Sequence, residues 1–231
     1  MVIELRFKPH GGGVWFADTF RQFAARELQD GKHQDVFWRQ DGKPRPGTPE
    51  IVFVGTKNWV GLRAYTASGG RAAALAAIDL ARALDRCYPG AAHHVDILEF
   101  QDGLDVDEWT LYSVRRLAIP RNKTRKHYDE WLRKGAPPEG SSKAPLDPSL
   151  HGVVTDVALA GLRERYPEAK WTVRPHGELM VGTPVTVGGE LCFTVRDLSI
   201  WLPNRLRAPL QIGALRSRGF GDLRRIVGDR P

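Results

Sequence analysis

The residues best suited to chemistry lie near the C-terminus, where glycines and arginines are interspersed in the run Gly213-Ala-Leu-Arg-Ser-Arg-Gly-Phe-Gly-Asp-Leu-Arg-Arg. Glycine lets a backbone amide approach a ligand that a Cβ would obstruct, and successive amides can form an anion-binding nest. Guanidinium groups add bidentate contacts to phosphate. The segment predicts binding of a polyanion, RNA or DNA. The simpler alternative is a glycine-rich turn with solvated arginines.

Two stretches of the chain carry the residues that we expect to contact a nucleic acid. In the glycine-rich segment they are Arg216, Ser217, Arg218, Gly219, Phe220, Arg224 and Arg225. The second stretch, 115–126, contains six basic residues and no acid, and a basic segment continues to residue 134. Its expected contacts are Arg115, Arg116, Arg121, Lys123, Arg125, Lys126 and Arg133. A helix with cations along one side can grip duplex RNA, although it could also be a solvated surface helix.

Composition agrees with a nucleic-acid partner. The chain has 231 residues with a formal net charge of +7, and its pI is about 9.6. Such a balance is unusual for an enzyme of small anions and suits a polyanion. Cys87 and Cys192 are isolated, so they form no zinc motif and favour a reducing cytoplasm. We expect no signal peptide, no membrane span, and neither a metal nor another cofactor.

Motifs of several other enzyme classes are absent from the sequence. It has no GxxxxGK[ST], no GxSxG and no HExxH. The acidic residues Asp102, Asp105, Asp107 and Glu108 precede an expected strand and are better explained by a solvated loop than by a metal site. His93 and His94 lead a strand with no further ligand at metal-binding spacing, which indicates a structural role.

Hydrophobic periodicity predicts the elements that must position these residues. The first half reads as a strand at 2–7, a helix at about 15–29, β-rich pieces at 35–40, 51–55 and 59–66, a helix at 70–87 and a strand at 94–100. This is the β-α-β-β-α-β order of a ferredoxin-like unit.

The second half predicts a less regular unit of the same kind. We expect strands at 109–119, 170–175, 179–181, 184–187, 191–199 and 224–227, helices at 121–134 and 147–166, and a short helix at 204–211. The fold class is therefore α+β, with two tandem ferredoxin-like (RRM-like) units at 1–105 and 106–231. The second unit includes a basic helical insertion at about 120–148 and a glycine-rich loop at 213–221.

The Arg-Ser-Arg-Gly-Phe-Gly run, which follows small residues and precedes a final strand, resembles the glycine-rich loop of the CRISPR-associated repeat-binding (RAMP) superfamily. Within it, the chain most resembles the repeat-cleaving endoribonucleases that make guide RNA. The resemblance implies a metal-independent endoribonuclease that binds the hairpin of a CRISPR repeat. It would cut the RNA by 2′-OH attack to give a cyclic phosphate, and would stay bound as a subunit of the guide-RNA effector complex.

The resemblance also directs attention to the first helix for the catalytic residues. Relatives usually place a histidine in or just after this helix, and His33 falls in about that place. No histidine lies inside the helix itself, and some members, especially those of type IV systems, depend on arginines instead. We therefore rank Arg21, Arg26 and Arg39 ahead of His33, with Arg218 or Arg225 completing the site. His10, beside the glycine turn, is a further candidate.

Two other functions stay open from the sequence. The chain could be a non-catalytic subunit of the same superfamily that binds the 5′ handle of guide RNA. It could also be a structural protein that binds DNA or ribosomal RNA without cutting it.

Overall fold

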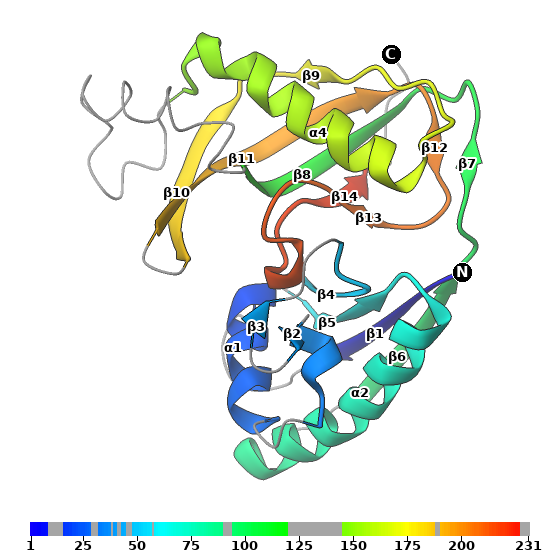
Figure 1. The fold of residues 1–231 in the computed structure, drawn as a ribbon, viewed down its shortest axis with the longest axis vertical. Helices are drawn as coiled ribbons and strands as arrows, with labels where there is room; N and C mark the ends of the chain where they lie inside the picture. The colour runs from blue at the N-terminus through cyan, green and yellow to red at the C-terminus, as the bar shows by residue number, and fades with distance from the viewer. Residues whose placement is uncertain are drawn as a thin grey trace. The chain divides into compact units, whose positions relative to one another are not determined.

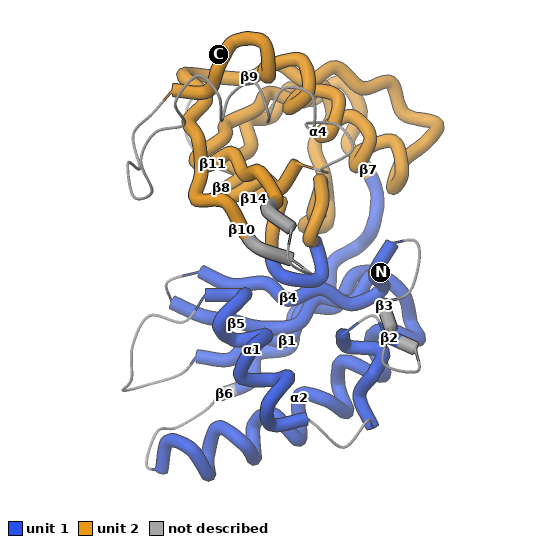
Figure 2. Tube along the Cα trace, turned by 60° about the vertical axis from the view of Figure 1, so that its left-hand side comes forward, with its two compact units in different colours: residues 1–103, 216–219 blue, residues 104–215, 220–231 orange. Residues whose placement is uncertain are grey.

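The structure is a computed structural model, and it describes residues 1–8, 16–28, 32–37, 39–40, 43–44, 48–56, 58–89, 94–119, 145–187 and 190–226. The chain forms two compact units (Figure 2). Unit 1 comprises Met1–Gly103 together with Arg216–Gly219, and unit 2 comprises Leu104–Leu215 and Phe220–Pro231. Among the described residues, no helix is long and apolar enough to cross a membrane.

Unit 1 has the ferredoxin-like arrangement that the sequence predicts (Figure 1). Strands β1 (Val2–Lys8), β4 (Ile51–Gly55), β5 (Val60–Ala64) and β6 (His94–Phe100) form an antiparallel sheet in the order β4-β5-β1-β6. If these four strands are numbered one to four along the chain, their order across the sheet is two, three, one, four. The order is that of a split pair of β-α-β units.

Helices α1 (Ala17–Glu27) and α2 (Ala67–Cys87) pack on one apolar core. The ring of Phe20 on α1 lies 5.2 Å from that of Phe7 and 6.0 Å from that of Phe53. Helix α2 begins at a cap, where the Thr66 hydroxyl accepts a hydrogen bond from the Gly69 amide at 3.0 Å. Its buried face consists mainly of alanines and leucines, which lets the helix lie close to the sheet.

The segment between α1 and β4 differs from the expected strand at 35–40. Residues Gln34–Phe37 form a 3-10 helix, η1, and only Arg39–Gln40 (β2) pairs as a strand, with Lys43–Pro44 (β3). Val36 is fully buried in the core of unit 1. One turn of helix buries this side chain and leaves its polar neighbours exposed. In so short a segment, the sequence pattern of such a turn is the same as that of an alternating strand.

Unit 2 repeats the strand order of unit 1. The strands β8 (Thr110–Ala118), β10 (Met180–Val187), β11 (Glu190–Leu202) and β14 (Asp222–Arg225) lie in the order β10-β11-β8-β14, and β13 (Leu210–Gln211) extends the edge. Helix α4 (His151–Arg165), preceded by the 3-10 turn η2 (Pro148–Leu150), crosses one face of this sheet (Figure 1). Gly161 brings α4 close to Ile212.

Three expectations for unit 2 needed correction. The stretches at 179–181 and 184–187 belong to one strand, β10, with a register shift between Gly182 and Val185. The strand expected at 170–175 is shorter and lies later, as β9 (Arg174–His176) on the edge of β11. The helix expected at 204–211 is wrong, because this segment forms β12 (Arg205–Leu206), which pairs with β7 (Leu104–Asp105), and β13.

The basic helix expected at 121–134 lies outside the described residues.

Candidate active site

Arg21 lies on α1 with its side chain half-buried. Its guanidinium carbon is 5.6 Å from the centre of the Phe37 ring, at the end of η1. The Nε atom is buried and has no hydrogen-bond partner among the described residues. A buried N–H without an acceptor is costly, and it is a ready donor for a ligand oxygen.

Two further arginines lie near Arg21. Burial, together with the positive charges of Arg218 and Arg39, lowers the pKa of Arg21 to about 10. The groups that shift this pKa are cations, with no carboxylate among them in the described part of the chain. A guanidinium with a pKa near 10 still carries its proton at neutral pH. No carboxylate of the described residues pairs with Arg21, Arg39 or Arg218, which we call the arginine cluster, so they form a positive site that an anion would stabilise.

The glycine-rich segment places Arg218 beside α1. Residues Arg216–Arg218 form the 3-10 turn η3, and Gly219 follows with φ of +89°. A Cβ at Gly219 would lie 2.2 Å from the Cβ of Ala17 and 3.1 Å from the carbonyl oxygen of Phe53. Only glycine allows this approach, so Gly219 is what permits the turn to pack against the start of α1 and β4.

The glycine amides have a role other than the expected anion nest. The Gly219 amide donates a hydrogen bond to the Arg216 carbonyl at 2.9 Å, and the Gly221 amide donates one to the Arg116 carbonyl at 2.7 Å. These two donors are already used by the protein. These two glycines therefore serve chain packing, and the arginine side chains of the segment are the charged groups that can contact an anion.

Phe220 does not occupy an exposed position. It is 3% exposed and packs with Ala118 and Cys192 in the core of unit 2, under the guanidinium of Arg116 at 4.5 Å. The sequence predicts an RNA contact at Phe220, but a ring buried in this way is not presented to a base. An apolar residue between two glycines is equally suited to anchor a loop, and sequence alone does not separate the two roles.

The other expected RNA contacts are distributed over both units. In unit 1, the Arg216 guanidinium donates to the Thr48 hydroxyl at 3.4 Å, and Ser217 lies in η3. In unit 2, Arg224 forms an ion pair with Asp222 at 2.8 Å, while Arg115 and Arg225 are exposed. The remaining residues expected to contact RNA, Arg121, Lys123, Arg125, Lys126 and Arg133, lie outside the described part of the chain.

His33 is part of the interior of unit 1. It is 8% exposed, and its Nε2 lies 2.9 Å from Oδ2 of Asp79 on α2. This hydrogen bond is the main reason that the pKa of Asp79 lies below its usual value. The contact fixes the segment after α1 to α2, which is a structural role. His10 lies outside the described residues, and so does the side chain of His94.

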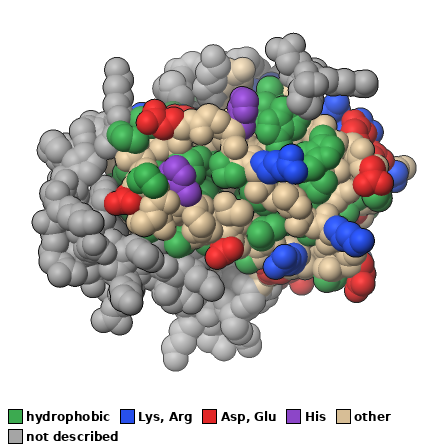
Figure 3. All heavy atoms as spheres, turned by 90° about the horizontal axis from the view of Figure 1, so that it is seen from above, with side chains coloured by type: hydrophobic (Ala, Val, Ile, Leu, Met, Phe, Trp, Pro, Cys, Tyr) green, Lys and Arg blue, Asp and Glu red, His purple; other side chains and the backbone are tan. Residues whose placement is uncertain are grey.

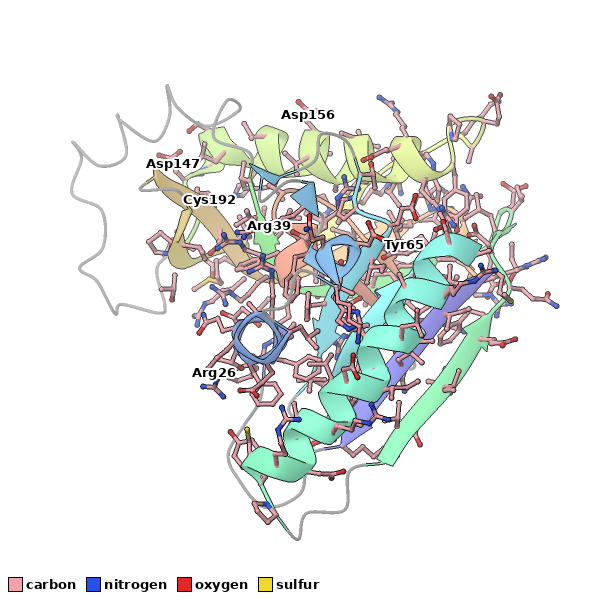
Figure 4. All side chains as sticks on the ribbon, turned by 60° about the horizontal axis from the view of Figure 1, so that its bottom comes forward. Arg26, Arg39, Tyr65, Asp147, Asp156 and Cys192 are labelled. Carbon is pink, nitrogen blue, oxygen red and sulfur yellow. The ribbon has the colours of Figure 1, made fainter. Side chains whose placement is uncertain are left out.

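Arg26 lies apart from the arginine cluster. In Figure 4, α1 is seen nearly along its axis, with Arg26 and Arg39 labelled on opposite sides of it. The Arg26 Nε atom forms an ion pair with Glu27 at 2.8 Å, which raises the pKa of Arg26. Five positions on a helix turn the side chain well away from Arg21, so the two arginines cannot share one phosphate.

One neighbour of the arginine cluster was missed by sequence reasoning. The sequence predicts Phe37 as part of a strand and not of a site, whereas its ring faces the guanidinium of Arg21. The only sequence feature that could have drawn attention to Phe37 is the apolar pair Val36-Phe37 shortly after His33.

One face of the molecule carries described side chains of both charges. On the face seen in Figure 3, Lys and Arg side chains are interspersed with Asp and Glu and with apolar side chains. This described surface is not a uniform basic field. No three His, Cys, Asp or Glu side chains of the described residues come together as ligands for a metal ion.

Comparison with known proteins finds similarity in structure and not in sequence. No family model and no curated protein sequence matches the chain. Among solved structures, Csf5, a CRISPR-Cas type IV Cas6 crRNA endonuclease, is similar with a TM-score of 0.61 and 17% identity, over 98% of this chain and 99% of that one.

Two structures of Cas6b are also similar. One, a CRISPR RNA processing endoribonuclease, has a TM-score of 0.56 and 14% identity, over 98% of this chain and 100% of that one. The other has a TM-score of 0.60 and 13% identity, with the same coverage. The chain therefore shares, over almost its whole length, the α+β fold of structures of Cas6 CRISPR RNA endonucleases.

Proposed function

We propose that this protein is a metal-independent endoribonuclease that cuts the repeat hairpin of CRISPR precursor RNA to give guide RNA. The observation that carries the proposal is the arginine cluster, in which Arg21 is half-buried with an unbonded Nε beside two more cations. The shared fold of Cas6 endonucleases supports the choice of RNA as the anion.

The proposed reaction is an internal transesterification. The 2′-oxygen forms a bond to the adjacent phosphorus, the bond from phosphorus to the 5′-oxygen breaks, and the products are a 2′,3′-cyclic phosphate and a 5′-hydroxyl end. The proton of the 2′-hydroxyl passes to water, and water protonates the 5′-oxygen. No step in this scheme requires a metal.

The cluster would act on the charge that develops at phosphorus. Arg21 remains protonated at neutral pH, since its pKa is about 10, so it acts as a donor and not as a base. Its unbonded Nε would bind one phosphate oxygen, and Arg39 and Arg218 would neutralise the others. Because the donors are held by helix, strand and turn before RNA arrives, little reorganisation is needed.

Product retention follows from the same contacts. The phosphate groups on either side of the cut are bound equally before and after cleavage, which does not favour release. We therefore propose that the protein stays with its guide RNA and becomes a subunit of the effector complex. The basic stretch at 121–134 is proposed to hold the hairpin.

The test is cleavage of end-labelled repeat RNA in EDTA by the wild type, Arg21→Met and Arg82→Met. Methionine keeps much of the length of Arg21 and its packing on Phe37 while removing the charge. Arg82 is an exposed cation of unit 1 whose described partner is Asp79, so its variant controls for net charge. We expect Arg21→Met to slow the single cut about 100-fold or more under saturating protein, and Arg82→Met to change it less than about 3-fold.

Two results would contradict the proposal. One is a cut by wild-type protein that disappears in EDTA, which would rule out metal independence. The other is an undiminished rate in Arg21→Met, which would remove the cluster from catalysis. A 2′,3′-cyclic phosphate on the product would identify the reaction type directly.

A second candidate function is a guide-RNA subunit that binds without cutting. It is favoured by His33, because the only described histidine near α1 is engaged with Asp79 and lies outside the arginine cluster. The same assay decides between the two, since tight binding of the repeat by wild-type protein without any product would establish the non-catalytic function.

A further inference from the structure

One face of the unit 2 sheet carries aromatic and basic side chains that the proposed cleavage site does not use. Trp201 on β11 pairs in register with Leu111 on one side and with Arg174 on the other. Ser199, two residues earlier, pairs with His176. Side chains at directly paired positions point to the same face of a sheet. Trp201, Arg174 and His176 therefore share one face.

The opposite face of this sheet is the hydrophobic core. Tyr112 and Val114 on β8 and Leu198 and Ile200 on β11 are all buried, and they alternate with the residues of the first face. Helix α4 crosses one side of the sheet (Figure 1). Strand alternation thus assigns the apolar set to the core and leaves the aromatic and basic set outside it.

Four planar side chains of this face form two contacting pairs on neighbouring strands, which we call together the aromatic row: Trp109 with Arg174, and Trp201 with His176. The guanidinium of Arg174 lies 4.6 Å from the centre of the Trp109 ring. The rings of His176 and Trp201 are 6.3 Å apart, edge to face. Trp109 immediately precedes the buried Thr110 at the start of β8, which places it on the outer face with Leu111.

The aromatic row is accessible. Trp109 is 40% exposed, Arg174 and His176 are exposed, and Trp201 is half-buried. Pro175 lies between the two polar residues on β9, and a proline has no amide to offer a further strand, so this edge is not built for sheet extension. Of the described residues, none forms an ion pair with Arg174, whose described contact is the Trp109 ring.

Side chains of both charges lie around the aromatic row. Arg115 is exposed on the same face of β8. Asp197 is the exposed acid on the outer side of β11, where it lies beside Arg196, and Arg224 is paired with Asp222. Glu108, next to Trp109, is paired with Arg205. The guanidinium of Arg174 in the aromatic row is thus not paired with any of these carboxylates.

Flat aromatic rings interleaved with a guanidinium and an imidazole suit a single-stranded nucleic acid. Bases stack on indole, imidazole and guanidinium planes, and cations beside them contact the phosphates. Duplex RNA does not offer its base faces in this way, whereas an unpaired strand does. A peptide partner would gain little from the Arg174 guanidinium on a chain with a net charge of +7 unless the peptide were strongly acidic.

We propose that the aromatic row binds a single-stranded segment of RNA by base stacking, separately from the arginine cluster. The inference rests on the proposed function for its choice of RNA. In that setting, the ligand would be an unpaired stretch that flanks the hairpin, and the aromatic row would add affinity without taking part in the cut.

The test measures binding of a short single-stranded oligoadenylate RNA by fluorescence anisotropy. The variants are Trp109→Leu and Arg174→Ala, both at exposed positions, and Arg163→Ala on α4 removes a matched exposed charge. Thermal unfolding of each variant shows whether it is folded. We expect Trp109→Leu to weaken binding about 5- to 50-fold and Arg174→Ala about 3- to 10-fold. Arg163→Ala should change it less than about 2-fold.

The same variants are then tested on a repeat hairpin with and without an unpaired extension. We expect them to lower affinity for the extended hairpin and leave both affinity and cleavage of the blunt hairpin unchanged. Unchanged oligoadenylate binding in both folded variants would overturn the inference and would leave this surface to a protein partner.

Failure of the proposed function gives a different result. If wild-type protein cuts no hairpin while oligoadenylate binding still falls in Trp109→Leu, the nuclease proposal fails and the aromatic row stands.

Discussion

Arg21 and Arg26 lie on the same short helix and differ entirely in their neighbours. Arg26 is exposed and paired with Glu27, whereas Arg21 is half-buried with two arginines nearby and an unbonded Nε. Burial raises the cost of leaving a cation uncompensated, so Arg21 is the position at which an anion gains most. The difference follows from the side of α1 on which each residue lies, and not from the residue type.

We infer that the buried hydrogen bond between His33 and Asp79 contributes to stability and not to cleavage. We expect His33→Ala to lower the free energy of unfolding by about 1–3 kcal/mol, because a buried hydrogen bond to Asp79 is lost and a space is left. The cleavage rate of the folded variant should stay within about 3-fold of the wild type. Denaturant unfolding and single-turnover cleavage at low temperature measure the two quantities.

The pH dependence of stability provides an independent readout of this contact. The hydrogen bond from His33 holds the pKa of Asp79 below its usual value. This contribution is present above the unfolded-state pKa of Asp79 and is lost as pH falls through the folded-state pKa. His33→Ala should therefore lose less stability than the wild type on acidification below about pH 4. If His33→Ala instead loses cleavage while its free energy of unfolding stays at the wild-type value, His33 is catalytic.

At the scale of elements, the loop between β13 and β14 depends on the absence of a side chain. Gly221 has φ of +77°, and a Cβ there would lie 1.7 Å from the carbonyl oxygen of Ile212. The Ile212 amide in turn donates to the Gly221 carbonyl at 3.0 Å, which fixes the two segments together. The close contact between Gly221 and Ile212 therefore lies next to the pairing of β13 with β14 at the edge of the sheet.

Two glycine substitutions, one in this loop and one in α4, test whether the absence of a side chain is required at Gly221. Gly221→Ala should destabilise the protein by about 2–4 kcal/mol, because it combines a backbone clash with a strained φ. Gly152→Ala, in the first turn of α4 with no atom near its Cβ, should stabilise it by up to about 1 kcal/mol. Thermal unfolding of both variants checks the pair, and a mild effect at Gly221 would mean that the loop can rearrange.

At the scale of the whole molecule, the net charge of +7 predicts binding that depends strongly on salt. The logarithm of the RNA association constant should fall linearly with the logarithm of salt concentration. Arg218→Ala should reduce the magnitude of the slope by about 0.7 to 0.9, the amount expected for one lost phosphate contact. Arg163→Ala should leave it unchanged, and anisotropy titrations at several salt concentrations measure both.

An equal change of slope in the two variants would contradict this prediction, because it would attribute RNA affinity to net charge and not to particular arginines.

Hydrophobic periodicity was enough to predict most of the regular elements. It identified β1, α1, α2, β8 and α4 close to their observed bounds, because each buries a one-sided apolar face. It identified β6 from its alternation, although the described side chains of this strand are half-buried or exposed. It failed at 34–37 and 204–211, where short segments bury one or two side chains and the choice between turn, strand and helix depends on the surroundings. The α+β fold with its antiparallel sheets followed from the order of the long elements.

The sequence by itself determined the basic charge, the β-α-β-β-α-β order of elements in the first unit and the candidate arginines, since these depend on residue type and local period. Only the tertiary structure decided which arginines come together. Arg21, Arg39 and Arg218 are far apart in the chain, and they meet because Gly219 allows η3 to pack against Ala17 and Phe53. It also decided that Phe220 and His33 are interior residues, because burial depends on what packs around a side chain, which no local pattern contains.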